Sequence, residues 1–387
     1  MKKLLILTLL AAILMLSGCS HHAQVENQAF LLVMGLDRTA DGQIEMSVQI
    51  PSIAGNSDSA DGAASPNGSA NYARMSVTGA SYEEALERLD WISPRDLNPA
   101  QLKLVVISRD LAESDICPNL INHISQTERL FTATRVAVCE GSAKEFVSSI
   151  QPTVGTRLST DISAMFDHYI GRGFIPRSRL ADLYYLMNSV YSDPMTSYAV
   201  LEPKALAKSE SGDEAQPASA LSGDLASLSS EFESDIPTRY LGAAVFSGGK
   251  MRGVLDGEQT ICTNLLLNEL NSFFYNVKEA SVELIPEGKI KLTVDTQSDP
   301  VRLIVKGKLS LSAEELPIDE DALIRHLRED VKNTIRTAQR MGVEPFGFAE
   351  AAAKHFLTIE DWVNYGWKRR YLNAQVEVDL SLATSDA

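Results

Sequence analysis

The first eighteen residues decide which part of this chain folds and on which side of a membrane it does so. Lys2 and Lys3 form a positively charged start, and an unbroken apolar run follows from Leu4 to Leu16. This is the layout of a secretory signal peptide, and the run is too short and wrongly flanked for a stable membrane span. We therefore expect residues 1–18 to be removed and the remainder to fold outside the cytoplasm.

Cys19 follows this segment directly, after Leu16-Ser17-Gly18. An ordinary signal peptide more often ends at an Ala-x-Ala-like site, whereas a cysteine at this point resembles the lipobox of bacterial lipoproteins. In that motif the thiol is acylated, with palmitate among the acyl groups, and the cysteine becomes the new N-terminus. We predict lipidation at Cys19 and a membrane-anchored protein, since several acyl chains anchor stably at about 0.8 kcal/mol per buried methylene.

The charge of the chain limits its partners. The 387 residues carry a net charge of −16, and the signal peptide contains two lysines and no acid, so the mature protein carries −18. A body this acidic is repelled by phosphate backbones and anionic headgroups, which excludes nucleic acid as a partner and a basic surface as the membrane anchor. The hydrophobic fraction of 44% is ordinary for folded protein, and the length suits two or three domains.

The remaining cysteines are Cys117, Cys139 and Cys262, with no Cys-x-x-Cys among them. This excludes zinc ribbons and thioredoxin-type redox motifs. Cys139 ends an apolar run and is predicted to be a small buried residue. A disulfide between Cys117 and Cys139 stays an open alternative, but the spacing does not indicate a disulfide-dependent scaffold.

The first half of the chain alternates between strand and helix signals. Strands are predicted at 29–36, 43–50, 72–78, 102–107 and 135–138, and helices after Ser81, Asp110 and Ser142, with 157–191 mostly helical. Residues 54–70 contain almost no large apolar side chain and are predicted to form a mobile insert. Strands alternating with helices predict an α/β region over 19–205.

Residues 206–238 form an acidic tract rich in Ser and Ala, which we interpret as a linker. The region 239–387 is predicted as a second domain. It opens with a hairpin, 241–246 and 251–255, whose turn contains two glycines. A helix is expected around 265–270, strands over 282–311, a long helix over 319–341 ended by Gly342, and a final strand at 375–382. The fold class is therefore α/β (mixed α+β), multi-domain, with mixed sheets packed by helices.

The motifs that carry enzyme chemistry are missing from the sequence. It contains no phosphate-binding loop, dinucleotide fingerprint, zinc-protease motif or nucleophile elbow. Asp256 and Glu258 are a carboxylate pair of the kind glycosidases use, but they also suit the first turn of a helix. Of the six histidines, only His21 and His22 are adjacent, and the other four are widely separated in the sequence. We therefore predict no catalytic residues, no cofactor and no metal site.

Two clusters near the C-terminus each allow a binding role and a purely structural one. Lys368-Arg369-Arg370 is the densest basic cluster and faces either headgroups, an acidic partner or only the C-terminal end of its own helix. Trp362 and Trp367 are predicted to pack in the core, with a stacking platform for a ligand as the alternative.

With these segments in place, the chain resembles the Ger(x)C family, the lipoprotein subunits of spore germinant receptors. The most specific stretch is Leu241 to Phe246, followed by Lys250 and by Gly253 to Glu258. The other matches follow in chain order: Glu26 with Ala29-Phe30, 33–37, 48–51, 78–81, 93–95, 102–107, 135–138, Gly347-Phe348, Trp362 and Trp367. The chain departs from the family pattern at Ser20-His21-His22, where Trp-Asp is usual, and at Gln101, where histidine is common.

The resemblance implies a non-enzymatic subunit on the outer face of the inner spore membrane. It would assemble with two polytopic membrane subunits into a receptor whose nutrient binding triggers germination. The expected partner contact is the hairpin region, with Gly242, Phe246, Lys250, Asp256 and Glu258 as candidate residues. Two alternatives are a solute-binding lipoprotein of the cell envelope and a cell-wall hydrolase that uses Asp256 or Glu258.

Overall fold

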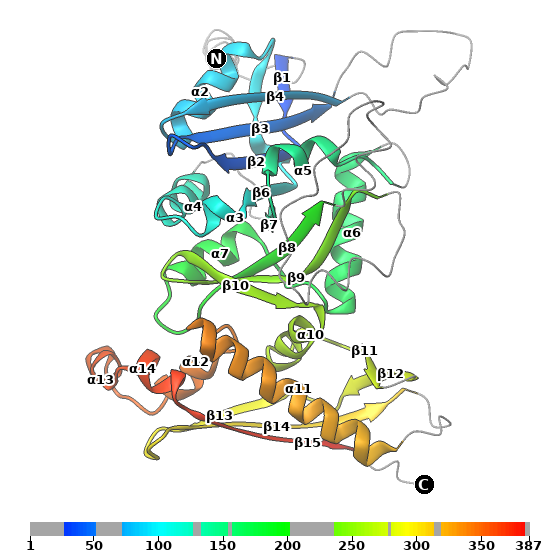
Figure 1. The fold of residues 1–387 in the computed structure, drawn as a ribbon, viewed down its shortest axis with the longest axis vertical. Coiled ribbons are helices and arrows are strands. Elements are labelled where there is room, and N and C mark those ends of the chain that lie inside the picture. Colours follow the sequence, from blue (N-terminus) through cyan, green and yellow to red (C-terminus); the bar gives the residue numbers. More distant parts are fainter. Residues whose placement is uncertain are drawn as a thin grey trace, which may run out of the picture.

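The computed structural model describes residues 27–51, 72–126, 133–153, 157–201, 236–277, 280–312 and 319–383. The predicted lipid site at Cys19, the insert 54–70 and all but the last residues of the linker 206–238 lie outside these ranges. Within them the chain forms an elongated molecule, with the N-terminal elements at one end and the C-terminal sheet at the other (Figure 1).

A mixed eight-stranded sheet organises the upper part of the molecule (Figure 1). Its strand order is β10-β9-β8-β7-β6-β2-β3-β4. The four central strands β2, β6, β7 and β8 run parallel, and the flanking pairs are antiparallel. The strands are β2 (Val33–Arg38), β3 (Ile44–Pro51), β4 (Tyr72–Gly79), β6 (Leu104–Ser108), β7 (Arg135–Cys139), β8 (Met195–Leu201), β9 (Thr238–Ser247) and β10 (Lys250–Asp256). A separate parallel pair joins β1 (Gln28–Phe30) to β5 (Asp96–Asn98).

Helices cover both faces of this sheet. Alternate residues of the apolar strand β6 enter two different cores, Val105 and Ile107 on one face and Leu104 and Val106 on the other. The first core packs against α2 (Tyr82–Ile92), α3 (Arg109–Ala112), α4 (Cys117–Gln126) and α7 (Leu180–Met187). The second packs against α5 (Ala143–Ser149) and α6 (Leu158–Arg172). A parallel strand buried on both faces reads as a continuous apolar run, which is how β6 appears in the sequence.

The C-terminal part is built on a second mixed sheet. Strand β14 (Arg302–Leu311) pairs antiparallel with β12 (Ala280–Pro286) and β13 (Lys291–Asp295), and parallel with β15 (Gln375–Leu382). Strand β11 (Phe273–Val277) extends the sheet beyond β12. The C-terminal helices are α10 (Gly257–Leu266), α11 (Glu320–Met341), α12 (Phe348–Ala353), α13 (Ile359–Tyr365) and α14 (Trp367–Leu372). In the N-terminal part, one short helical turn, η3 (Pro99–Gln101), follows β5.

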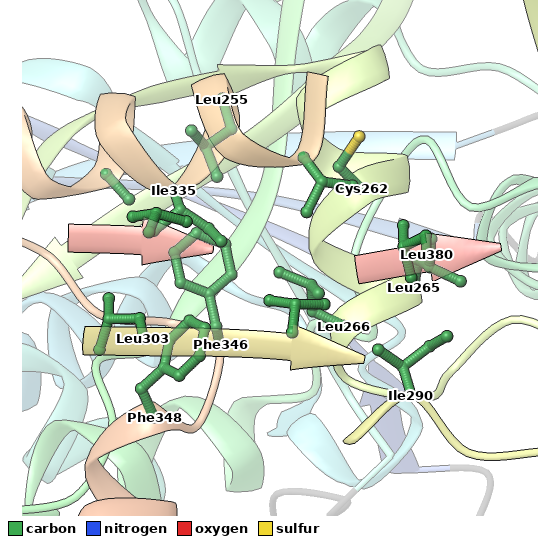
Figure 2. Close-up of a cluster of buried hydrophobic side chains, with 14 of the residues drawn as sticks. Leu255, Cys262, Leu265, Leu266, Ile290, Leu303, Ile335, Phe346, Phe348 and Leu380 are labelled. Carbon is green, nitrogen blue, oxygen red and sulfur yellow. The ribbon is translucent and has the colours of Figure 1, made fainter. Parts of the chain in front are cut away.

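The amphipathic helix α11 and the helix α10 bury their apolar sides on this sheet. Figure 2 shows Cys262, Leu265 and Leu266 of α10 gathered with Ile335 of α11 and with Phe346 and Phe348 beyond it. Leu255 of the hairpin belongs to the same core. A buried stripe at spacings of three and four is what the sequence predicted for α11, and Asp319 and Gly342 cap its two ends.

The structure confirms the mixed α/β fold class, the hairpin, the long helix over 319–341 and the final strand. The helix expected around 265–270 was misplaced, because α10 begins directly after Asp256 and ends at Leu266. Cys117, Cys139 and Cys262 are free and buried. The alternative of a disulfide between Cys117 and Cys139 is therefore wrong.

Candidate functional site

The hairpin β9–β10 contains most of the residues predicted to contact a partner, and these residues have distinct environments. Gly242 has φ = +145°, and a Cβ built on it would lie 2.1 Å from the carbonyl oxygen of Leu255 on the neighbouring strand. Phe246 is fully buried in the core beneath α4 and α7. Neither residue offers surface to a partner, and both serve the packing of the hairpin.

The two faces of this hairpin belong to different cores. Ala244, Phe246 and Met251 pack with the N-terminal helices, whereas Ala243, Val245 and Leu255 pack with α10 and α11. The hairpin is therefore shared between the N-terminal and C-terminal parts of the molecule. This explains why the segment Leu241–Phe246 is apolar throughout and does not alternate.

Two of the candidate residues carry side chains at the surface. The Lys250 ammonium, at the start of β10, forms an ion pair with Asp115 in the loop before α4. Glu258 lies exposed in the first turn of α10. Desolvation, and then the neighbouring carboxylates of Asp256 and Asp330, raise the pKa of Glu258. Glu258 is exposed and Lys250 is half-buried, so solvent, and hence a partner, reaches both side chains.

Asp256 has a structural role at the end of the hairpin. Its carboxylate accepts a hydrogen bond from the backbone N–H of Gln259 at 2.8 Å, and the Gln259 side chain accepts one from the Asp256 N–H at 3.2 Å. This reciprocal pair is a capping box, which satisfies two backbone donors at the start of α10. The arrangement accounts for Asp256 without an acid–base role.

The loop before β8 is hydrogen-bonded to the C-terminal part of the molecule. The Asp193 N–H donates to the Glu344 carbonyl at 2.9 Å, and the Glu344 N–H donates to Asp193 Oδ2 at 2.9 Å. The Lys368 ammonium, on α14, donates to Ser247 Oγ and lies 4.0 Å from Asp193 Oδ2. Three segments that are distant in the sequence are thus tied together at one junction.

Glu344 is the most unusual titratable group at this junction. Its buried carboxylate accepts four backbone N–H groups at 2.9–3.1 Å, from Phe346, Gly347, Phe348 and Ala349. Burial, with a smaller contribution from the charge of Asp193, raises the pKa of Glu344 to about 8, and the backbone N–H groups of Ala349, Phe348 and Gly347 oppose this. Burial also raises the pKa of Asp193, the second carboxylate at the junction.

A cavity of about 580 Å³ opens beside this junction. Its wall combines the loop 189–194, the segment 342–344 and residues of α13 and α14. Tyr191, Trp362 and Trp367 form a continuous aromatic wall, with ring centroids 6.0 Å and 5.7 Å apart. Both tryptophans are buried, as the sequence predicted, yet they also line this cavity. Sequence reasoning missed the cavity because its walls come from segments with no local signal that they meet.

Within the described ranges, no group of His, Cys, Asp or Glu residues is arranged to hold a metal ion. Among the helices of those same ranges, none has the length and apolar character needed to cross a membrane.

Comparison with known families and curated proteins gives consistent matches over the length of the chain. A family described as the spore germination protein N-terminal domain matches residues 21–201, and one described as spore germination B3/GerAC like, C-terminal, matches residues 241–385. The putative spore germination protein YfkR of Bacillus subtilis (strain 168) is 21% identical over 397 residues, covering 96% of this chain and 93% of the relative. Spore germination protein KC of the same organism is 21% identical over 408 residues, covering 99% and 95%.

A solved structure gives the same fold. The crystal structure of the GerBC protein matches with a TM-score of 0.51 and 12% identity, over 90% of this chain and 96% of that one. At this level of identity the match shows the architecture alone.

Proposed function

This chain belongs to the GerAC family of spore germination proteins, and from that membership we propose that it is the non-enzymatic, lipid-anchored subunit of a nutrient germinant receptor. The observation that carries the proposal is the ordered pair of family matches, over 21–201 and 241–385, which leave little of the mature chain unmatched. The ordered motifs found in the sequence, from Glu26 to Trp367, point to the same assignment.

The lipid anchor is the proposed means of membrane attachment. The sequence Leu16-Ser17-Gly18-Cys19 supports acylation of the Cys19 thiol. The net charge of the mature chain, −16 − 2 = −18 without Lys2 and Lys3, argues against attachment through a basic surface, because anionic headgroups repel an acidic body. The protein would then stand on the outer face of the inner spore membrane.

The proposed partners are two polytopic membrane subunits. We place part of the contact on Lys250, whose side chain is half-buried, and on the exposed Glu258, because Gly242 and Phe246 are buried in packing and Asp256 caps α10. Nutrient binding by the assembled receptor would trigger germination.

The proposal is tested by affinity purification from detergent-solubilised spore membranes. The tagged wild-type protein should co-purify two polytopic proteins. A Cys19→Ala variant should be lost from the membrane fraction, whereas Ser20→Ala, which changes the neighbouring residue and keeps the thiol, should behave as wild type. Recovery of the protein alone, together with normal germination of a deletion strain, would contradict the receptor role.

A further inference from the structure

We propose that the start of α13 inserts apolar side chains into the lipid bilayer, as a second membrane contact in addition to the lipid anchor. The inserted residues are Leu357, Ile359 and Val363, which we call the α13 tip. This inference rests on the proposed anchor at Cys19, since the anchor is what holds the chain at the membrane. It determines how the molecule lies, with one of its long sides along the bilayer.

The α13 tip exposes three large aliphatic side chains within seven residues. Leu357 is 99% exposed, Ile359 69% and Val363 62%. Ile359 and Val363 are four residues apart and therefore lie on one side of the helix. A single exposed aliphatic residue is common at a protein surface, whereas a cluster marks a surface that binds another protein or a membrane.

Leu357 is exposed at a position where an apolar side chain ordinarily packs. Thr358 caps α13 by accepting a hydrogen bond from the Asp361 N–H, so Leu357 is the residue before the cap. An apolar residue there often packs against the fourth residue of the helix, here Trp362. Phe356 packs on Trp362 instead, with ring centroids 5.6 Å apart.

The shape of the tip favours lipid over a protein partner. The Leu357 side chain projects into solvent with almost none of its surface covered by the rest of the chain. A stable protein interface buries about 800 Å² on each partner, which calls for an extended surface. A few projecting side chains on a short helix are instead what enters the boundary between headgroups and acyl chains.

The charged residues around the α13 tip leave its apolar side clear. At 3.6 residues per turn, Glu360 projects about 80° from the middle of that side and Asp361 about 180° from it. Lys354 precedes the tip and Arg369 follows it on α14, both with exposed side chains. Such side chains keep the charge in water while the methylene stem covers apolar surface. Since acids and bases are balanced here, apolar insertion and not attraction to anionic lipid drives the contact.

The anchored end and the α13 tip lie along the same side of the molecule. Cys19 precedes Gln28 of β1 by nine residues, a length that spans at most about 30 Å. Gln28 lines a cavity together with residues of α2, so the anchor attaches beside that helix. Figure 1 shows α2, α4 and α7 along one long side, with α13 farther along that side. A molecule lying on this side brings the anchor and the α13 tip to one bilayer.

The test places a fluorescent label on the lipidated protein in phosphatidylcholine vesicles, whose zwitterionic headgroups do not repel an acidic chain. Three of the cysteines are buried, and the thiol of Cys19 is acylated in the proposed anchor. A cysteine introduced by Leu357→Cys therefore takes an NBD label selectively. Ser163→Cys gives the control label, because Ser163 is exposed on α6, which covers the other face of the large sheet.

We expect the emission of the label at position 357 to shift to shorter wavelength when the protein binds vesicles. It should also be quenched by lipid with a doxyl group near the top of the acyl chain, since interfacial helices enter about 5–10 Å deep. The label at position 163 should show neither change. Ile359→Asp should remove both changes at position 357. Asn364→Asp, which adds the same charge on another side of α13, should leave them in place.

Vesicle flotation separates this contact from the anchor. If the protein floats with the vesicles while the label at position 357 remains in water, the bilayer contact is overturned and the anchor stands. Equal quenching at positions 357 and 163, equal effects of the two aspartate variants, or a shift that requires added membrane proteins would overturn it as well. Protein that does not float contradicts the anchor and this contact together.

Discussion

At the residue scale, Gly242 shows how one position limits the geometry of the hairpin. Its φ of +145° and the 2.1 Å approach of a would-be Cβ to the Leu255 carbonyl leave no space for a side chain. We expect Gly242→Ala to lower the free energy of unfolding by about 3 kcal/mol, from backbone strain together with steric overlap. Denaturant unfolding measures this.

Gly171 provides the matched control for that substitution. It lies in α6, and no atom lies within 4 Å of a Cβ built on it. Gly171→Ala should therefore raise stability by up to about 1 kcal/mol, through helix propensity alone. Equal effects of the two substitutions would show that Gly242 is not under steric constraint.

Glu344 makes a pH-dependent contribution at the same scale. Burial raises its pKa to about 8 in the folded protein, from 4.5. A carboxyl with a raised folded pKa binds its proton more tightly in the folded state, so its contribution is fully present below about pH 4.5. It is then lost as the pH rises to about 8, at about 1.4 kcal/mol per pH unit.

Glu344→Gln removes this titration and should flatten the slope of stability against pH between 5 and 8. Urea unfolding at a series of pH values, for wild type and variant, measures the difference. Parallel slopes would mean that the backbone N–H donors, and not burial, set the ionisation of Glu344.

At the element scale, local patterns predicted the helices and strands whose signals are contained in one segment. The stripe of α11 is an example, because periodicity reports which side of a helix is buried. The alternation over 43–50 predicted the strand β3 correctly but not its burial, since the polar residues Ser47 and Gln49 are buried as well. The expected helix around 265–270 follows the apolar residues there, whereas α10 begins after the capping residue Asp256 and ends at Leu266. The cavity and the double burial of the hairpin depend on contacts between distant segments, to which periodicity is blind.

The cap on α10 gives a prediction at this scale. Asp256→Ala should lower the free energy of unfolding by about 1 kcal/mol, whereas Asp256→Asn, which keeps an acceptor for the Gln259 N–H, should change it little. Thermal unfolding of the two variants and of Glu258→Gln measures the effect. Peptidoglycan cleavage by the wild type that Asp256→Asn abolishes would instead revive the hydrolase alternative.

At the scale of the whole molecule, the main feature is that the eight-stranded sheet extends across the predicted linker. Strand β8 precedes residues 206–238, and β9, which pairs with it, begins at Thr238. The hairpin then buries one face in each half. The two regions that the sequence divides at residue 239 therefore share one sheet, and the core of each region packs against one face of the hairpin.

This architecture predicts what happens when the chain is cut in the linker. If a protease recognition site is placed within 206–235 and cleaved, the two fragments should remain together in size-exclusion chromatography. They are joined by the β8–β9 pairing and by the mutual hydrogen bonds of Asp193 and Glu344. Residues 239–387 expressed alone should instead aggregate, because Ala244, Phe246 and Met251 lose the helices that cover them. Two separate, soluble fragments after cleavage would show that the halves are independent domains and that the hairpin belongs to the second one alone.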